Sequence, residues 1–76
     1  MKMKRYANLH GNSGVLAYEA SPESIIVQFQ GGERYEYTTK SAGAAVIEEM
    51  HRLARAGSGL SAFIARHKPP YARRLP

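Results

Sequence analysis

The chain of 76 residues contains no cysteine and no aspartate. Without cysteine it can form neither a disulfide framework nor a thiolate metal site, and this absence fits a cytosolic protein. Six glutamates carry all of the acidic charge, and no two of them form a pair that the sequence marks as a general acid and base. We therefore expect a non-enzymatic protein without a metal ion or cofactor.

One spacing in the chain is typical of metal sites. Glu48 and His51 form a Glu-x-x-His motif, which places both side chains on one face of a helix. Di-metal helix bundles need two such motifs and further glutamates, which this chain lacks. The motif therefore indicates an exposed polar helix face.

Long apolar runs are also missing. No run approaches the ~20 residues that a transmembrane helix requires. The basic start "MKMKRY" lacks the apolar stretch of a secretory signal. We expect a cytoplasmic protein that does not bind membranes.

Acidic residues are absent from the part of the chain that follows Glu49. Up to Lys40 there are five cations and four glutamates, whereas from Ser41 onward six cations face only Glu48 and Glu49. The net charge of +5 is therefore segregated. Such segregation produces a positive field that favours acidic partners, although a net charge also simply keeps a small protein soluble.

Alternating apolar residues predict a β-meander in the first half of the chain. The turn cluster "GNSG" at 11–14 separates an N-terminal arm, or short extra strand, from the core. Strands are predicted in 15–19, 25–29 and 33–37, with Leu16 and Tyr18 on one face of the first. We divide the single domain into an arm (1–12), a β-meander (13–39), helices (41–68) and a basic tail (69–76).

The glycine pair at 31–32 sets the register of the second hairpin. A two-residue loop would place Arg34 opposite Phe29 on the apolar face. A loop of residues 31–33 instead places Tyr35 opposite Phe29. Because a slip of one residue exchanges the two faces of a strand, burial favours the longer loop, with both tyrosines of the third strand facing inward.

Residues 41–57 predict a helix that Ser41 caps and Gly57 ends. Its apolar stripe consists of Val46, Met50 and Leu53, widened by Ile47 and Ala54. A short second helix starts at Ser58 or Ser61, and Pro69-Pro70 must stop it. The predicted fold is α+β: a three-stranded antiparallel β-meander followed by one longer and one short helix packed on one face.

The segments "NSGVLAYEA", "IIVQFQGGERYEYT" and "YARR" resemble the KTSC domain, a short module named after the C-terminus of some lysyl-tRNA synthetases and also found as small stand-alone bacterial proteins. The resemblance runs from about Asn12 to Arg74. It implies the same meander with helices, and a role in binding RNA or a metabolite. The family usually shows Ser-x-Gly after the first helix, then aromatics and an asparagine; "GSGLSAFIARH" keeps the small residues but lacks that asparagine.

The turn "GSG" at 57–59 precedes a helix, where backbone amides can receive an anion. It is not a Walker loop, because no Gly-Lys-Ser/Thr follows and no strand precedes it. Two interpretations remain open: a plain turn between helices, or an anion seat at Ser58 and Gly59.

The tyrosines fall into two groups. We expect Tyr35 and Tyr37 to pack in the core rather than to stack on bases. Tyr6 and Tyr71 lie beside cations outside the central pattern, so exposed stacking and docking onto the sheet both stay open. The closing stretch "RHKPPYARRLP" is either a phosphate-binding segment or a solvated basic terminus.

The favoured hypothesis is a sequence-independent RNA-binding domain with a C-terminal basic surface. Tyr71 would stack on a base, and the phosphate contacts would come from Arg52, Arg55, Arg66, Lys68, Arg73 and Arg74. The alternative is a protein-interaction module or homodimer. It would expose a strand edge at 15–19, or a helix face through Ile47 and Leu60.

Overall fold

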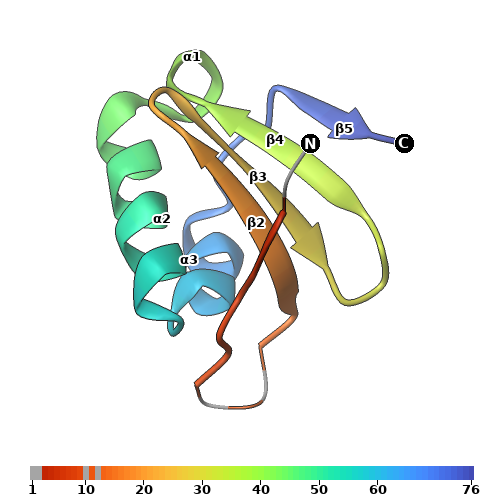
Figure 1. The fold of residues 1–76 in the computed structure, drawn as a ribbon. Coiled ribbons are helices and arrows are strands. Elements are labelled where there is room, and N and C mark those ends of the chain that lie inside the picture. The colour runs from red at the N-terminus through yellow and green to blue at the C-terminus, as the bar shows by residue number, and fades with distance from the viewer. Residues whose placement is uncertain (1–2, 10, 12) are drawn as a thin grey trace.

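Five antiparallel strands and three helices make up the part of the chain that the structure describes, a computed structural model covering residues 3–9, 11 and 13–76 (Figure 1). The strands lie in the sheet in sequence order. They are β1 (Lys4–Arg5), β2 (Val15–Ser21), β3 (Ser24–Phe29), β4 (Arg34–Thr38) and β5 (Arg73–Leu75). The helices are α1 (Thr39–Ala42), α2 (Ala44–Ala56) and α3 (Leu60–His67). Residues 1, 2, 10 and 12 of the predicted arm lie outside the described residues.

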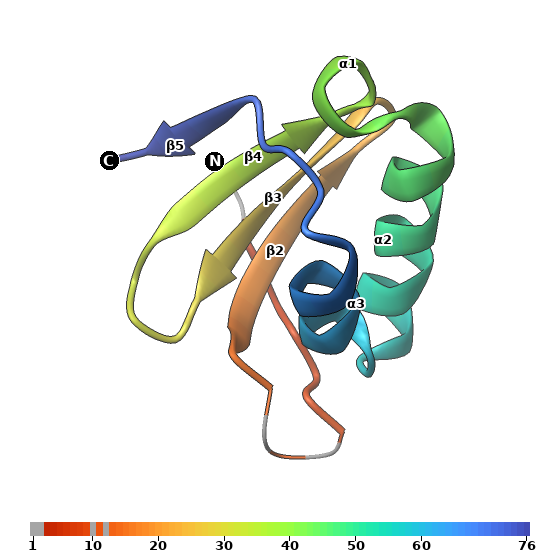
Figure 2. The same ribbon diagram turned by 180° about the vertical axis from the view of Figure 1, so that it is seen from behind.

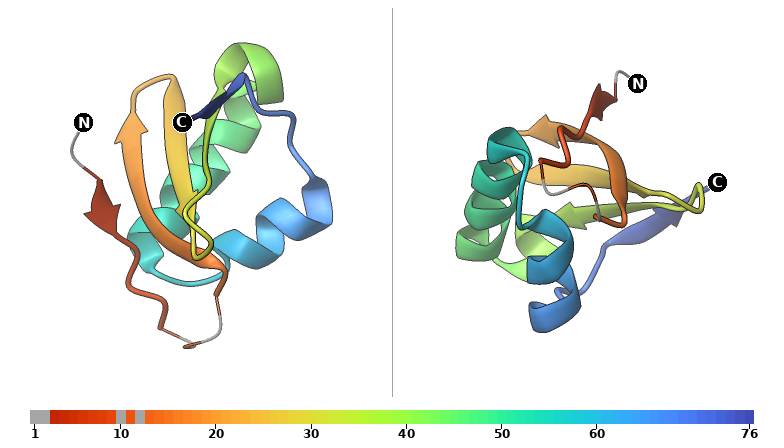
Figure 3. Two further views of the ribbon diagram at one scale, coloured as in Figure 1. Left: turned by 90° about the vertical axis from the view of Figure 1, so that its right-hand side faces the viewer. Right: turned by 90° about the horizontal axis from the view of Figure 1, so that it is seen from below.

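Helices α2 and α3 cover one face of the sheet (Figures 2 and 3). The core fills the space between these two layers. Its fully buried side chains come from both layers and are Val15, Ile25, Val27, Ile47, Met50 and Leu60. The predicted α+β class is therefore confirmed, and the apolar stripe of the long helix faces the sheet as expected.

The sheet has two strands more than the predicted meander. The N-terminal arm contributes β1, which pairs with β2, and the basic tail contributes β5, which pairs with β4. Both strands are short and consist largely of cations, so neither shows the alternation that reveals a strand in a sequence. They pair with the two outer strands of the meander, whose backbone groups would otherwise lack partners.

A β-bulge changes which side chains of β2 reach the core. Val15 lies opposite Phe29, but Ala17 lies opposite Gln28, so the register shifts between them. The extra residue interrupts the alternation, and Val15 and Tyr18 both join the core. The prediction that Leu16 shares the inner face with Tyr18 is wrong for this reason.

The hairpin between β3 and β4 keeps the predicted faces but not the predicted register. Phe29 lies opposite Glu33, because its N–H donates to the Glu33 carbonyl at 2.8 Å. Tyr35 consequently pairs with Val27 and Tyr37 with Ile25, two residues away from the predicted partners. Tyr37 is 4% exposed, which confirms that this strand turns its tyrosines inward.

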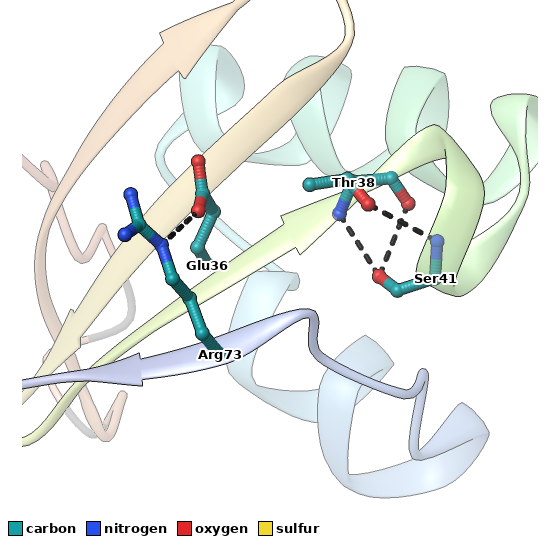
Figure 4. Close-up of polar contacts among 4 residues, drawn as sticks. All are labelled: Glu36, Thr38, Ser41 and Arg73. Atoms are coloured by element: carbon teal, nitrogen blue, oxygen red, sulfur yellow. Dashed lines mark hydrogen bonds and ion pairs between the residues drawn. The ribbon is translucent and has the colours of Figure 1, made fainter.

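The predicted long helix is divided at Gly43. Thr38, not Ser41, begins the helical region: its hydroxyl accepts the Ser41 N–H, and the Ser41 hydroxyl accepts the Thr38 N–H in a capping box (Figure 4). Gly43 then adopts φ 97° and separates α1 from α2. A side chain disfavours this backbone conformation, so the glycine decides where the long helix starts.

Gly57 joins three parts of the molecule. It ends α2 in the left-handed conformation, with φ 76°, as predicted. Its carbonyl accepts the Leu9 N–H at 2.8 Å, which fastens the N-terminal segment to the turn between the helices. A Cβ atom at this position would lie 2.6 Å from the Cβ of Ala7, so only glycine fits this close approach.

We predict that Gly57→Ala destabilises the protein more than Gly32→Ala does. Gly32 also has a positive φ, 97°, but a Cβ there meets open space. The backbone strain alone should lower the free energy of unfolding by about 1–2 kcal/mol at either site, and the clash with Ala7 should add to this loss only at Gly57. Urea denaturation followed by circular dichroism measures both values; equal losses would contradict the close approach.

Candidate nucleic-acid interface

The basic tail is attached to the body of the protein rather than free. Lys68 ends α3 in the left-handed conformation, and the following Pro69 is buried. The Ala72 N–H then donates to the Glu36 carbonyl at 2.7 Å, and β5 continues this pairing along β4. The tail is therefore docked onto the sheet, and residues 70–74 are exposed to solvent.

Tyr71 lies where the tail meets the sheet. Its ring centroid is 4.7 Å from that of Tyr35 and 6.4 Å from that of Tyr37, the latter in an edge-to-face arrangement. We call these three residues the tyrosine cluster. Tyr71 is nevertheless 52% exposed, so it docks onto the sheet and still presents ring surface to solvent. The ring is therefore docked onto the sheet, and stacking on a base stays a prediction.

The tyrosine cluster affects the ionisation of its most buried member. Burial raises the pKa of Tyr37 above its ordinary value of 10.0, and the neighbouring Tyr35 and Tyr71 raise it further. The Tyr37 phenol would become anionic on losing its proton, and its buried surroundings disfavour that charge. The folded protein therefore holds the Tyr37 proton more tightly than the unfolded chain does.

The two arginines of β5 differ in their surroundings. The Arg73 side chain reaches across β4 and its Nε lies 2.6 Å from Oε1 of Glu36, which offsets its charge (Figure 4). Arg74 instead lies over the ring of Tyr35, with its guanidinium carbon 5.9 Å from the ring centroid. Because successive side chains of a strand point to opposite faces, Arg74 belongs with the tyrosine cluster and Arg73 does not.

The cations of α2 are not gathered with those of β5. Arg52 forms an exposed ion pair with Glu49, and this hydrogen bond lowers the pKa of the carboxyl and raises that of the guanidinium. Arg55 borders a shallow hollow beside Lys4 and Tyr18, at the β1–β2 side of the sheet. Since β5 is the opposite edge, the structure separates Arg55 from Arg73 and Arg74.

Two further predicted cations lie in the sequence between those of α2 and those of β5. Arg66 is in the last turn of α3 and Lys68 directly follows it; both are exposed. Neither forms an ion pair with an acidic residue of the described chain. Both precede the segment that leads through the two prolines to Tyr71.

Tyr6, the other stacking candidate, is buried. It is 3% exposed and its hydroxyl accepts the Leu60 N–H at 3.2 Å. The stacking interpretation of Tyr6 is therefore wrong: the ring belongs to the core, and its hydroxyl satisfies the first amide of α3.

The surfaces predicted for a protein partner are mostly covered. Ile47 is 1% and Leu60 0% exposed, so neither offers an apolar helix face. The strand edge at 15–19 is paired with β1 at Ala17 and Tyr18. Among the described residues the only large apolar side chains that are well exposed are Leu9 and Tyr71, and they lie in segments far apart in the sequence.

The remaining candidates are the predicted anion seat and the Glu-x-x-His motif. Ser58 and Gly59 border a cavity of about 410 Å³ at the start of α3. His51 lies with its Nε2 2.9 Å from the Ser24 carbonyl oxygen, so it links α2 to β3 and its ring nitrogen is occupied. No helix of the described residues has the length and apolar character of a membrane span.

The fold and the site define an α+β protein with one face of its sheet covered by helices and a basic strand at the sheet edge, which follows Tyr71 in the chain. Comparisons of the chain with protein-family models, with curated proteins and with solved structures find no match.

We predict that Tyr37→Phe makes the protein less sensitive to alkaline pH. A pKa that is higher in the folded than in the unfolded state stabilises the fold fully below the unfolded value, and this stabilisation is lost as pH rises through the folded value. The free energy of unfolding should therefore decline between about pH 9 and about pH 11. Urea titrations at these pH values should show a smaller decline in the variant; identical declines would contradict the assignment to Tyr37.

Proposed function

We propose that this protein binds single-stranded RNA, largely independently of sequence, through a surface formed by Arg66, Lys68, Tyr71 and Arg74, which we call the C-terminal surface. The observation that carries the proposal is the half-exposed ring of Tyr71, held on the tyrosine cluster beside Arg74. Exposed aromatic rings beside cations are the common means of holding single strands.

The tyrosine cluster makes Tyr71 suited to stacking. Tyr35 and Tyr37 support its ring from the sheet, so a base would meet a surface that is already ordered. Ordering a side chain in advance reduces the entropy lost on binding. Every base has a flat apolar face, so stacking on Tyr71 would not select a sequence.

The cations of the C-terminal surface are available for phosphates. Arg66 and Lys68 have no acidic partner among the described residues, and Arg74 contacts a ring rather than a carboxylate. The charges of Arg73 and Arg52 are offset by Glu36 and Glu49. We therefore restrict the RNA site to part of the predicted set and leave Arg55 outside it.

The KTSC resemblance of the sequence agrees with this proposal, because the family is named after part of an RNA-binding enzyme. Membership of that family is itself part of the proposal. A protein-interaction role is less well supported, since the apolar side chains expected to serve it are buried.

We predict that Tyr71→Leu weakens binding of a fluorescently labelled single-stranded RNA, whereas Tyr71→Phe does not. Leucine keeps an apolar side chain against the sheet but loses the stacking face, and stacking is worth ~1–3 kcal/mol per base. Fluorescence anisotropy at low salt should show a Kd increase of about five-fold or more for the leucine variant. Absence of binding by the natural protein, or equal affinity of all three proteins, would refute the site.

A matched pair of charge variants separates specific phosphate contact from net charge. Arg74→Ala and Arg55→Ala remove the same charge from opposite edges of the sheet. We predict that Arg74→Ala reduces the slope of log affinity against log salt by about 0.7 for a single strand. Arg55→Ala should leave this slope unchanged. The same loss in both variants would show that only total charge matters.

A further inference from the structure

The last turn of α3 carries a second aromatic stack. The ring centroids of Phe63 and His67 lie 4.3 Å apart, and the two planes are tilted by 31°. Phe63 packs against the hydrophobic core, whereas His67 is exposed to solvent. An aromatic pair four residues apart on a helix is a stabilising contact, and here it supports a ring that solvent can still reach.

His67 lies at the exposed end of the buried face of α3. Leu60, Phe63 and Ile64 occupy this face. Position 67 continues it, because residues three, four and seven apart share one side of a helix. The inner face of α3 thus ends in an exposed ring rather than in a core side chain.

Tyr71 has the same arrangement as His67. It is 52% exposed, and its ring lies 4.7 Å from that of Tyr35, which packs against the core. Each of the two exposed rings therefore lies on an aromatic ring that the core holds in place. Such support reduces the entropy that a side chain loses when it binds a flat ligand.

The two rings lie close together along the chain, with a cation between them. Figure 2 shows the segment that runs from the end of α3 to β5. The four residues from His67 to Tyr71 span at most about 14 Å, and Pro69 and Pro70 restrict this connection by fixing φ. Lys68 directly follows His67 and forms no ion pair with an acidic residue of the described chain. The order of ring, cation and ring matches the alternation of base and phosphate in a nucleic-acid strand.

The charges around His67 are compatible with a phosphate. The hydrogen bond from Arg52 lowers the pKa of the Glu49 carboxyl, and the nearby His67 lowers it further. Glu49 is therefore an acidic neighbour of His67, but its ion pair with Arg52 offsets its charge. A phosphate beside the imidazole would meet the exposed cations Arg66 and Lys68.

We propose that His67 is a second base-stacking residue of the C-terminal surface, whose ligand is a single strand with at least two unpaired bases rather than a mononucleotide. One base stacks on Tyr71 and another on His67, with the phosphate between them at Lys68. The inference rests on the proposed RNA binding and adds the class of ligand to it. Two stacking rings favour single strands, because only unpaired bases can be splayed out onto aromatic side chains.

Two substitutions of His67 test the stacking role. His67→Gln loses the ring but keeps N–H donors, whereas His67→Phe keeps a ring without N–H donors. Fluorescence anisotropy with a short labelled oligouridylate should show a Kd increase of about five-fold or more for the glutamine variant, the effect of losing one stacked base. The phenylalanine variant should bind like the natural protein. Unchanged binding by the glutamine variant, or weaker binding by the phenylalanine variant, overturns the stacking role.

His51→Gln is the matched control, because it removes a histidine ring from α2 that contacts the Ser24 carbonyl. It should leave the RNA affinity unchanged, and urea denaturation checks that every variant is folded. The same loss of affinity in His51→Gln and His67→Gln would refute a role of His67 at the site.

Competition with unlabelled uridine monophosphate and with oligouridylates of increasing length tests the class of ligand. The affinity of the natural protein should rise steeply until the strand reaches both rings. In His67→Gln, which keeps one of the two rings, this steep rise should end at a shorter length. A monophosphate that competes as well as the longest strand, or the same length dependence in both proteins, overturns the two-base ligand.

Tyr71→Leu separates this inference from RNA binding itself. If the natural protein binds no RNA, or if Tyr71→Leu binds it equally well, the proposed function fails and the inference fails with it. If Tyr71→Leu weakens binding and His67→Gln does not, the surface binds RNA through one ring and only the inference is refuted.

Discussion

A chain of 76 residues has enough apolar side chains to build one layer between one sheet face and its helices. Both terminal segments dock onto this structure through a tyrosine. Tyr6 is buried beside the start of α3, whereas Tyr71 lies half-exposed over Tyr35 and Tyr37. The two tyrosines come from opposite ends of the sequence, yet each brings an edge strand with it. Both termini are thus held to the body of the protein by aromatic side chains as well as by strand pairing.

The positions of α2, α3 and β5 also determine where the positive charges lie on the surface. The cations that the sequence groups in its last part belong to α2, to the end of α3 and to β5, which are different places on the surface. Two of them are neutralised by glutamates and one contacts an aromatic ring. The proposed RNA site is accordingly smaller than the predicted one, and it depends on aromatic support as much as on charge.

The sequence predicts the central elements well because they bury regular apolar patterns. The three strands of the meander, the stripe of α2 and the stop at Gly57 all follow from such patterns. The hairpin shows where they fail: loops at 30–32 and at 31–33 put the same faces inward, so burial alone cannot distinguish them. The β-bulge in β2 could not be predicted for a similar reason: Val15 and Leu16 are both apolar, so the sequence does not show which of them faces the core.

The edges of the sheet and the candidate sites were harder to predict. β1 and β5 have no alternation, and each lies close in the sequence to a tyrosine that docks onto the rest of the fold. Tyr6 has charged neighbours in the sequence, whereas its partner Leu60 lies 54 positions away. The position of Arg55 likewise depends on how α2 crosses the sheet. In each case the deciding contact is long-range, and single-sequence patterns report mainly local structure.

The hydrogen bond from Ala72 to Glu36 has a separate consequence. It lies at the entrance to a three-residue edge strand, and short edge elements open with less free energy than the core requires. Hydrogen exchange at this single amide therefore measures detachment of the C-terminal segment, while the amides of β3 report global unfolding. The molecule thus contains a natural reporter of whether Tyr71 is seated.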